Sequence, residues 1–317
     1  MHYPLRRRNS PQKARRGFTL IELLIVIVII AILVGLLVPV VMGVMQNARI
    51  AQVRQEISQM ENAITAFKTS YDVEPPSRFV LYEDLADYLV TDADPVRDSI
   101  RIKSVAQIKR MWPLFAFTGT VDWDNGARTG PYVLNGAECL LFFLGGVIEP
   151  GSSPPRLLGF SKNPTSPFLG TGESREGPFL EFSASRIQDN QNTSADEGLD
   201  GQGVLGVPEY LDPLAGQTTP YYYINNADYR AHDDNEFAAL SPPLPAVLLP
   251  RSYKQGDSVR NYHKGKTFQI ISPGFDTNYG VGGTYEVDDT SHDGSAGHIN
   301  TADRDNITNF APAELRP

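Results

Sequence analysis

The stretch FTLIELLIVIVIIAILVGLLVPVVMGVM, residues 18–45, decides the fold of this 317-residue chain. Its only charged residue is Glu22, and an apolar run of this length predicts a membrane-spanning helix, for which about 20 residues suffice. A cleaved secretory signal has a shorter apolar core and a small-residue cleavage site after it. Residues 18–45 are too long for such a core, and no such site follows them, so we expect one transmembrane helix.

The segment before this run is basic. Residues 1–17 contain no acid and six cations, namely Arg6, Arg7, Arg8, Lys13, Arg15 and Arg16. Basic flanks stay on the cytoplasmic side, which predicts a single-pass membrane protein with a cytoplasmic N-terminus and an exported head. Residues 18–317 hold 22 basic and 37 acidic side chains, a net charge of −15. This acidic balance argues against nucleic acid as a partner, because binding phosphates requires clustered Lys and Arg.

The junction between these segments carries a family resemblance. The run Gly17-Phe18-Thr19-Leu20-Ile21-Glu22, followed by an apolar helix, resembles the class III signal of type IV pilins and type II secretion pseudopilins. The resemblance implies that a prepilin peptidase cuts after Gly17, at the end of a leader of residues 1–17, and that the new N-terminal amine of Phe18 is methylated. Pro39 falls where this family usually places a helix-kinking proline.

The same resemblance gives Glu22 a role in assembly. A carboxylate in the first turn of a membrane helix is costly and suggests a partner. In a filament, Glu22 would face the amine of Phe18 on a neighbouring subunit, and each charge would compensate for burial of the other. The alternative is that Glu22 merely sits at the membrane interface with its carboxylate in water.

Residues 46–74 predict an amphipathic continuation of the membrane helix. They contain no proline, and apolar residues recur every three or four positions, at Ile50, Val53, Ile57, Met60, Ile64 and Phe67. A helix from about residue 19 to residue 71 would be roughly 80 Å long, ending before Pro75 and Pro76. A spine helix whose outer half packs on a head is pilin architecture, so we expect an α+β, pilin-like fold with a small antiparallel sheet.

The head divides by composition into two parts. Residues 75–205 form an inserted region of irregular or mixed structure, with a short helix at 82–89, a buried segment at 135–146 and a possible strand at 178–187. Residues 206–317 predict a sheet with strands near 220–224 and 266–272, followed by an acidic loop.

This C-terminal part resembles the major, G-type pseudopilin. Its Asp212-Pro213-Leu214-Ala215-Gly216 turn, the following aromatic strand and the terminal Asp305-Asn306-Ile307 match that family's motifs, although Leu214 replaces the usual tryptophan. The resemblance implies calcium, with Asp276, Asp305 and Asn306 as candidate ligands; Asn306 replaces an acid. Calcium prefers carboxylate and carbonyl oxygens on a flexible loop. The alternative is a solvated acidic loop without a metal.

No pattern in the sequence predicts an enzyme. The histidines His232, His263, His292 and His298 lack the spacing of a zinc site, and no G-x-S-x-G or phosphate-binding glycine loop is present. The single cysteine, Cys139, lies in an apolar segment and excludes an internal disulfide.

Two hypotheses follow. The first is a structural subunit of a pilin-like filament, in particular a type II secretion pseudopilin. Its partners would be its own copies, minor pseudopilins, the prepilin peptidase, the inner-membrane assembly platform and, before assembly, membrane lipid. The second is an uncleaved, membrane-anchored periplasmic domain with a binding or enzymatic role.

Overall fold

A computed structural model describes residues 18–123, 131–149, 152, 155–172, 174–188, 208–225, 251–256, 261–286 and 298–315. The leader with Gly17, the acids Asp288, Asp289 and Asp293, and the histidines His232 and His292 lie outside the described residues. The chain forms two compact units, Met1–Ala48 and Arg49–Pro317, and each is described by itself.

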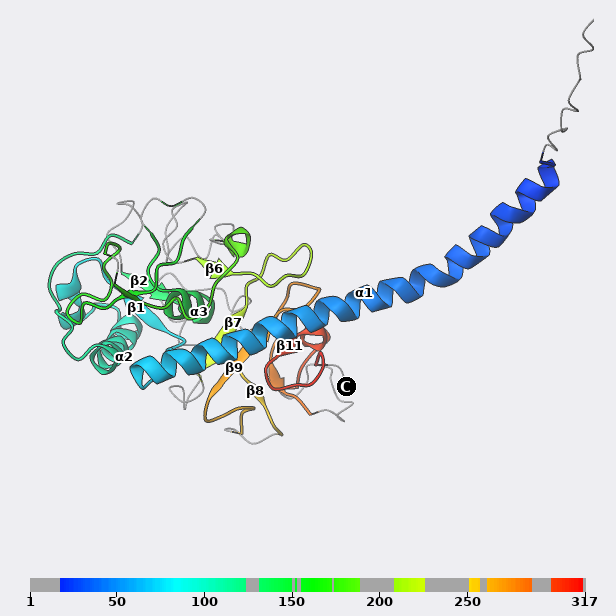
Figure 1. Cartoon of the computed structure of the whole chain (residues 1–317). Coiled ribbons are helices and arrows are strands. Elements are labelled where there is room, and N and C mark those ends of the chain that lie inside the picture. The colour runs from blue at the N-terminus through cyan, green and yellow to red at the C-terminus, as the bar shows by residue number, and fades with distance from the viewer. Residues whose placement is uncertain are drawn as a thin grey trace, which may run out of the picture. The chain divides into compact units, whose positions relative to one another are not determined.

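Helix α1, Leu20–Tyr71, begins in the first unit and ends in the second (Figure 1). Pro39 lies inside it, so the carbonyl of residue 35 lacks its usual amide donor, yet the helix continues. Among the described residues, α1 is the one helix long and apolar enough to cross a membrane. It ends at Asp72, whose positive φ of 58° turns the chain away before Pro75 and Pro76. The predicted helix and both of its ends are confirmed.

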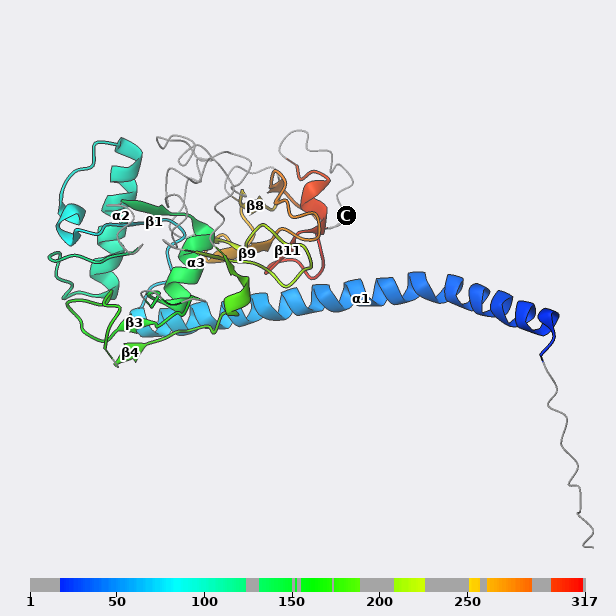
Figure 2. The same ribbon diagram turned by 90° about the horizontal axis from the view of Figure 1, so that it is seen from above.

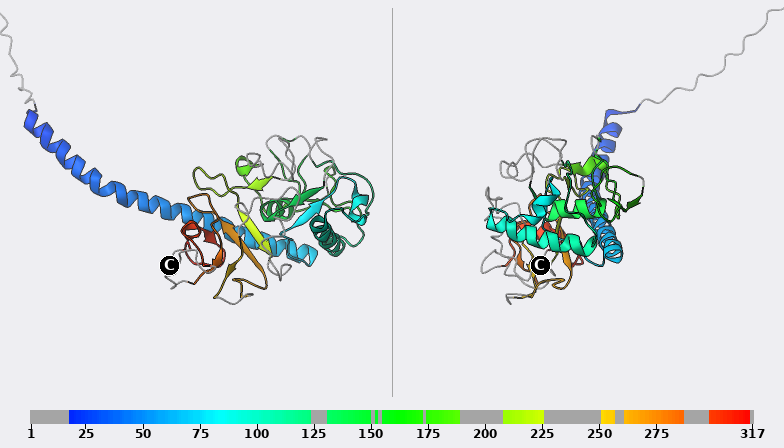
Figure 3. Two further views of the ribbon diagram at one scale, coloured as in Figure 1. Left: turned by 180° about the vertical axis from the view of Figure 1, so that it is seen from behind. Right: turned by 90° about the vertical axis from the view of Figure 1, so that its left-hand side faces the viewer.

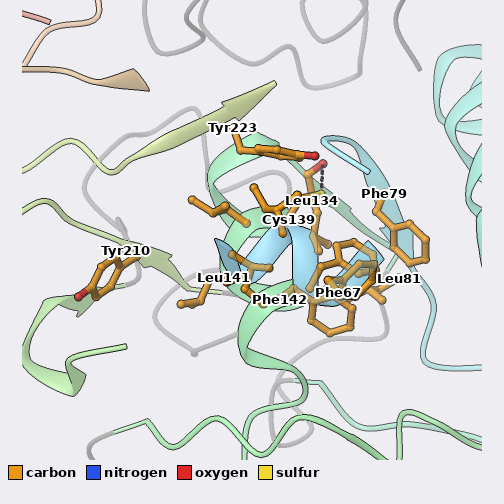
Figure 4. Close-up of a cluster of buried hydrophobic side chains, with 14 of the residues drawn as sticks. Phe67, Phe79, Leu81, Leu134, Cys139, Leu141, Phe142, Tyr210 and Tyr223 are labelled. Carbon is orange, nitrogen blue, oxygen red and sulfur yellow. Dashed lines mark hydrogen bonds between the residues drawn. The ribbon is translucent and has the colours of Figure 1, made fainter. Parts of the chain in front are cut away.

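The second unit is built around the outer part of α1. The predicted stripe is buried at Val53, Ile57, Met60, Ile64 and Phe67. These side chains belong to one apolar cluster with residues from the rest of the head. Figure 4 shows Phe67 among Leu81 and Phe142 of this cluster. Figure 3 shows helix α2 near the C-terminal end of α1.

The elements of the head are short. In chain order after α1 they are β1 (Phe79–Leu81), the 3-10 helix η1 (Leu85–Leu89), α2 (Pro95–Met111), β2 (Tyr132–Leu134), α3 (Gly136–Gly145), β3 (Phe160–Ser161), β4 (Arg175–Glu176), the 3-10 helix η2 (Ala184–Arg186), β5 (Ile187–Gln188), β6 (Glu209–Tyr210), β7 (Tyr222–Asn225), β8 (Tyr253–Lys254), β9 (Phe268–Ser272), β10 (Gly283–Thr284), the 3-10 helix η5 (Ala302–Asp305) and β11 (Ile307–Thr308).

The main sheet is antiparallel, in the order β11-β9-β7, with Tyr223 opposite Ile270 and Thr308 opposite Ile271. Every residue of β7 and β9 is buried. Three further antiparallel pairs, β1-β2, β3-β4 and β5-β6, and one parallel pair, β10-β8, complete the described strands. The expected α+β head with a small antiparallel sheet is therefore present (Figure 2).

Helix α3 lies inside the head, and all ten of its residues are buried. Asn135 and Glu138 form a capping box at its N-terminus, which satisfies amides that would otherwise be buried without a partner. Gly136 permits close packing on β7, because a Cβ there would lie 2.0 Å from the carbonyl oxygen of Tyr223. The buried segment expected at 135–146 is thus a central helix of the core.

The strand expected at 178–187 is wrong for most of its length. The amides of Phe179 and Leu180 both donate to the carbonyl oxygen of Leu144, at the C-terminal end of α3. Backbone groups used in this way cannot join a ladder, and only Ile187 of the predicted segment reaches a strand, β5.

Two glutamates of α1 attach the helix to the head. The carboxylate of Glu56 binds the guanidinium of Arg186 through two contacts of 2.7 and 2.8 Å, and accepts a hydrogen bond from Tyr221 at 3.0 Å. One helical turn and a little more along, Glu61 accepts from Lys264 at 2.9 Å and from Asn309 at 3.0 Å. These polar contacts flank the buried stripe on segments that are distant in sequence.

We expect Glu56→Ala to reduce the free energy of unfolding of the head by about 1–3 kcal/mol, because it leaves a half-buried Arg186 without its carboxylate. Denaturant titration of the detergent-solubilised chain, followed by tryptophan fluorescence, measures this change. Gln55→Ala, at an exposed neighbouring position on the same helix, is the matched control. Equal stability of the two variants would show that the ion pair does not hold the helix.

Candidate functional site

The first site is the start of α1. Glu22 Oε2 accepts hydrogen bonds from the backbone nitrogen and the hydroxyl of Thr19, each at 2.8 Å. In return, the Glu22 amide donates to Thr19 Oγ1 at 3.3 Å. This reciprocal pattern is a capping box, and a negative charge there also suits the positive end of the helix dipole. The Phe18 side chain beside it is 88% exposed.

Thr19 is a site residue that the sequence reasoning missed. The pattern Thr19-x-x-Glu22 is a capping-box signal, and reading it would have assigned the helix start as well as a local partner for the carboxylate. Glu22 therefore has hydrogen-bond partners within its own chain. A cationic amine brought to this end of the helix would meet a carboxylate already held in place.

Residues 18–48 are all exposed, and apart from Thr19, Glu22, Gln46 and Asn47 they are apolar or glycine or proline. A span with this much exposed apolar surface is unfavourable in water, so it requires lipid or other apolar helices around it. Its backbone amides and carbonyls are paired within the helix, apart from the gap at Pro39, and this is the condition for entering a bilayer.

The exposed face of α1 in the head is unusual in composition. The exposed residues between 51 and 71 are Ala51, Gln52, Gln55, Ser58, Gln59, Asn62, Thr65, Ala66, Lys68, Thr69 and Ser70. Only Lys68 is charged, and it pairs with Glu74 at 3.0 Å. A helix face that meets water usually carries charged residues. The members of this set other than Lys68, named here the uncharged face, are suited to contact with another polypeptide.

The C-terminal turn is joined to the sheet by a buried carboxylate. Asp212 accepts hydrogen bonds from the Ser272 hydroxyl at 2.5 Å, the Leu214 amide at 2.9 Å and the Gln217 side chain at 2.8 Å. Burial raises the pKa of the Asp212 carboxyl. The structure thus connects the 212–216 turn to the end of β9, two segments that the sequence reasoning singled out separately.

Two of the predicted calcium ligands, Asp276 and Asp305, lie near each other. Asp305 Oδ2 accepts hydrogen bonds from the backbone amides of Phe275 and Asp276, at 2.6 and 2.9 Å. Asp276 is exposed, and its own Oδ1 accepts from the Asn278 amide at 2.8 Å. Burial, together with the charge of Asp305 nearby, raises the pKa of Asp276. The structure brings these segments together through amide-to-carboxylate contacts.

Asn306, the third predicted ligand, is fully buried. Its side-chain nitrogen donates to the Tyr253 hydroxyl at 2.7 Å and to the Tyr279 carbonyl at 2.9 Å, while its Oδ1 has no hydrogen-bond partner. Within the described ranges, no group of three His, Cys, Asp or Glu side chains is placed to hold a metal ion. Calcium at Asp276, Asp305 and Asn306 stays a prediction.

His263 and Cys139, two side chains of the head that could take part in chemistry, are both packed against other parts of the head. His263 stacks on Phe310 at 4.4 Å, with ring nitrogens near the Tyr285 carbonyl and the Gln255 side chain. Burial lowers the pKa of His263 and raises that of Cys139. Cys139 is fully buried in α3, in an apolar environment that does not favour a thiolate.

Comparison with known proteins finds a match that includes the first site, the start of α1. The family model described as the prokaryotic N-terminal methylation motif matches residues 12–38. Searches of curated proteins and of solved structures found no match to the chain. The chain therefore carries, at the start of a long apolar helix, the methylation motif of type IV pilin-like proteins, which are substrates of prepilin peptidase.

Proposed function

We propose that this chain is a structural subunit of a pilin-like filament, and that within this class it is a type II secretion pseudopilin. The observation that carries the proposal is the methylation motif at residues 12–38, whose part from Leu20 onward lies on a helix that continues without a break to Tyr71 in the head. The chain would be stored in the inner membrane as a single-pass protein, with its N-terminus cytoplasmic and its head periplasmic.

Processing supplies the groups for assembly. Cleavage after Gly17 removes the basic leader and leaves a new amine on Phe18, which the peptidase methylates. The Glu22 carboxylate, held by Thr19, would receive this amine from a neighbouring copy. Both charges are then compensated inside an apolar bundle, where either one alone would be costly.

Two surfaces support polymerisation. Transfer of residues 20–45 from lipid to a bundle of identical helices keeps their apolar side chains away from water. The uncharged face continues along the same helix into the head, where copies can approach without like-charge repulsion. A free-standing anchored domain has no need of such a face, and this favours the filament over an uncleaved binding or enzymatic domain.

The C-terminal segment favours a pseudopilin over an adhesive or motile pilin. Asp212 joins the turn resembling the G-type motif to Ser272, at the start of the segment that resembles the family's calcium loop. Minor pseudopilins and an inner-membrane assembly platform are the further partners that this subtype implies.

The first test is the intact mass and N-terminal sequence of the chain purified from its own membranes. We expect a polypeptide that starts at methylated Phe18. Gly17→Leu, a change at the cleavage site, should retain residues 1–17 and serves as the unprocessed control. A wild-type chain that keeps Met1 would contradict the filament proposal and favour the uncleaved anchored domain.

Removing the Glu22 carboxylate should abolish assembly without unfolding the head. We expect Glu22→Ala to be processed and inserted normally, but to yield at least ~10-fold fewer crosslinked oligomers and filaments, since the loss of one charge pair of about 1.4 kcal/mol or more has this effect. Glu149→Ala, which removes a partly exposed carboxylate of the head that pairs with Arg156, is the control. Normal filaments from Glu22→Ala would refute a role of this residue in assembly.

A charge introduced on the uncharged face should also weaken assembly. Gln59→Glu keeps the size of the side chain and remains exposed in the single subunit, so its head should melt at the wild-type temperature. Its oligomer yield should fall several-fold, because identical charges would meet between copies. Gln59→Asn controls for the change in shape, and equal yields from both variants would show that the uncharged face is free in the filament.

A further inference from the structure

Asp303 occupies the centre of the C-terminal loop. It is fully buried, and its two carboxylate oxygens accept four hydrogen bonds. Oδ1 receives the Gly282 amide and the Tyr253 hydroxyl, both at 2.8 Å. Oδ2 receives the amides of Asn300 at 2.8 Å and Val281 at 3.1 Å. The carboxylate therefore connects the loop after β9, the residues before η5 and strand β8.

The backbone of the loop is shaped around this carboxylate. Gly280 and Gly282 have positive φ angles of 70° and 62°, which other residues rarely adopt. A Cβ on Gly280 would lie 2.4 Å from the Asp303 carboxyl carbon, so only glycine permits this approach. Successive amides that point into one concavity form an anion-binding nest, and here the anion is a side chain of the same polypeptide.

A second carboxylate, two residues further along the chain, repeats the pattern. Asp305 Oδ2 receives the amides of Phe275 and Asp276, and a Cβ on Gly274 would lie 2.4 Å from the Asp305 carbonyl oxygen. The donors around both aspartates present the positive ends of their dipoles to the carboxylates. The four donors around Asp303 match the roughly four lone-pair sites of its carboxylate, so a cation at this carboxylate would have to displace hydrogen bonds.

We propose that the loop of residues 273–283 is closed by the carboxylates of Asp303 and Asp305 acting as internal anions, and that the head therefore folds without calcium. The rival is the calcium site predicted at Asp276, Asp305 and Asn306, for which the unpartnered Oδ1 of Asn306 is the available buried oxygen. The proposal concerns the head alone and does not depend on filament assembly.

The test uses the full chain in detergent, with thermal unfolding followed by tryptophan fluorescence. Wild type is measured with excess EGTA and with millimolar calcium chloride, and we expect the same midpoint in both. Asp303→Asn should lower the midpoint by roughly 5 °C or more in both conditions, because one carboxylate oxygen becomes an amide facing backbone donors. Asp276→Asn, at an exposed position, should melt like wild type.

Two outcomes would overturn the proposal. One is a wild-type midpoint that rises with calcium and loses this rise in Asp276→Asn, which would place a cation at the predicted ligands. The other is an Asp303→Asn midpoint equal to that of wild type. If Asp303→Asn fails to fold, hydrogen exchange of the wild-type chain tests the proposal at the amides of Val281, Gly282 and Asn300. Slow exchange of these amides in EGTA supports closure without calcium. Exchange that is slowed only by calcium refutes the proposal.

Discussion

The backbone of helix α1 is uninterrupted, but its two parts require different surroundings: an apolar environment for the first part, and the head on one side with water on the other for the second. Over residues 20–45 every side chain except that of Glu22 is compatible with hydrocarbon, and the amides are paired internally except where Pro39 removes a donor. Beyond residue 49 the same helix must present apolar side chains on one side only, because the head covers that side alone. The remaining features of the chain follow from this division: a buried stripe, two carboxylates along its flanks, and a face that carries almost no charge.

The two attachments at Glu56 and Glu61 show how a helix with few polar anchors is held in register. An apolar stripe alone permits sliding by one turn with modest loss, since similar side chains recur at each step. Carboxylates that must meet Arg186, Tyr221, Lys264 and Asn309 at hydrogen-bond distance do not permit it. The contacts thus select one position for the helix on the head, whatever their net contribution to stability.

Much of this arrangement was predictable from the sequence, because it rests on local periodicity. The length of α1, its buried positions and its end before Pro75 follow from spacing and proline chemistry. Partners that depend on tertiary contacts were not predictable. The segment at 178–187 has the composition of a strand, yet its amides at Phe179 and Leu180 donate to the carbonyl of Leu144. No feature of the segment's own sequence indicates this contact.

The same limit applied to the loop near the C-terminus, where Asp303 was one acid among several. Its role depends on Gly280 and Gly282, more than twenty residues away, whose conformations bring the amides to it. The contact of Thr19 is local, because its partner Glu22 is only three residues away, and the capping pattern could have been recognised in the sequence. The sequence predicted which residues of the helix are buried. It did not predict contacts that form only when two loops come together.

The capping box at Thr19 and Glu22 has a consequence for the maturation of the chain. Both capping residues lie after the Gly17–Phe18 bond, and the first helical residue is Leu20. The beginning of the helix is thus encoded entirely in the part of the chain that the proposed cleavage retains. Loss of the leader would neither unwind the helix nor shift its first turn, so precursor and mature subunit would present the same helix end, differing only in the charge in front of it.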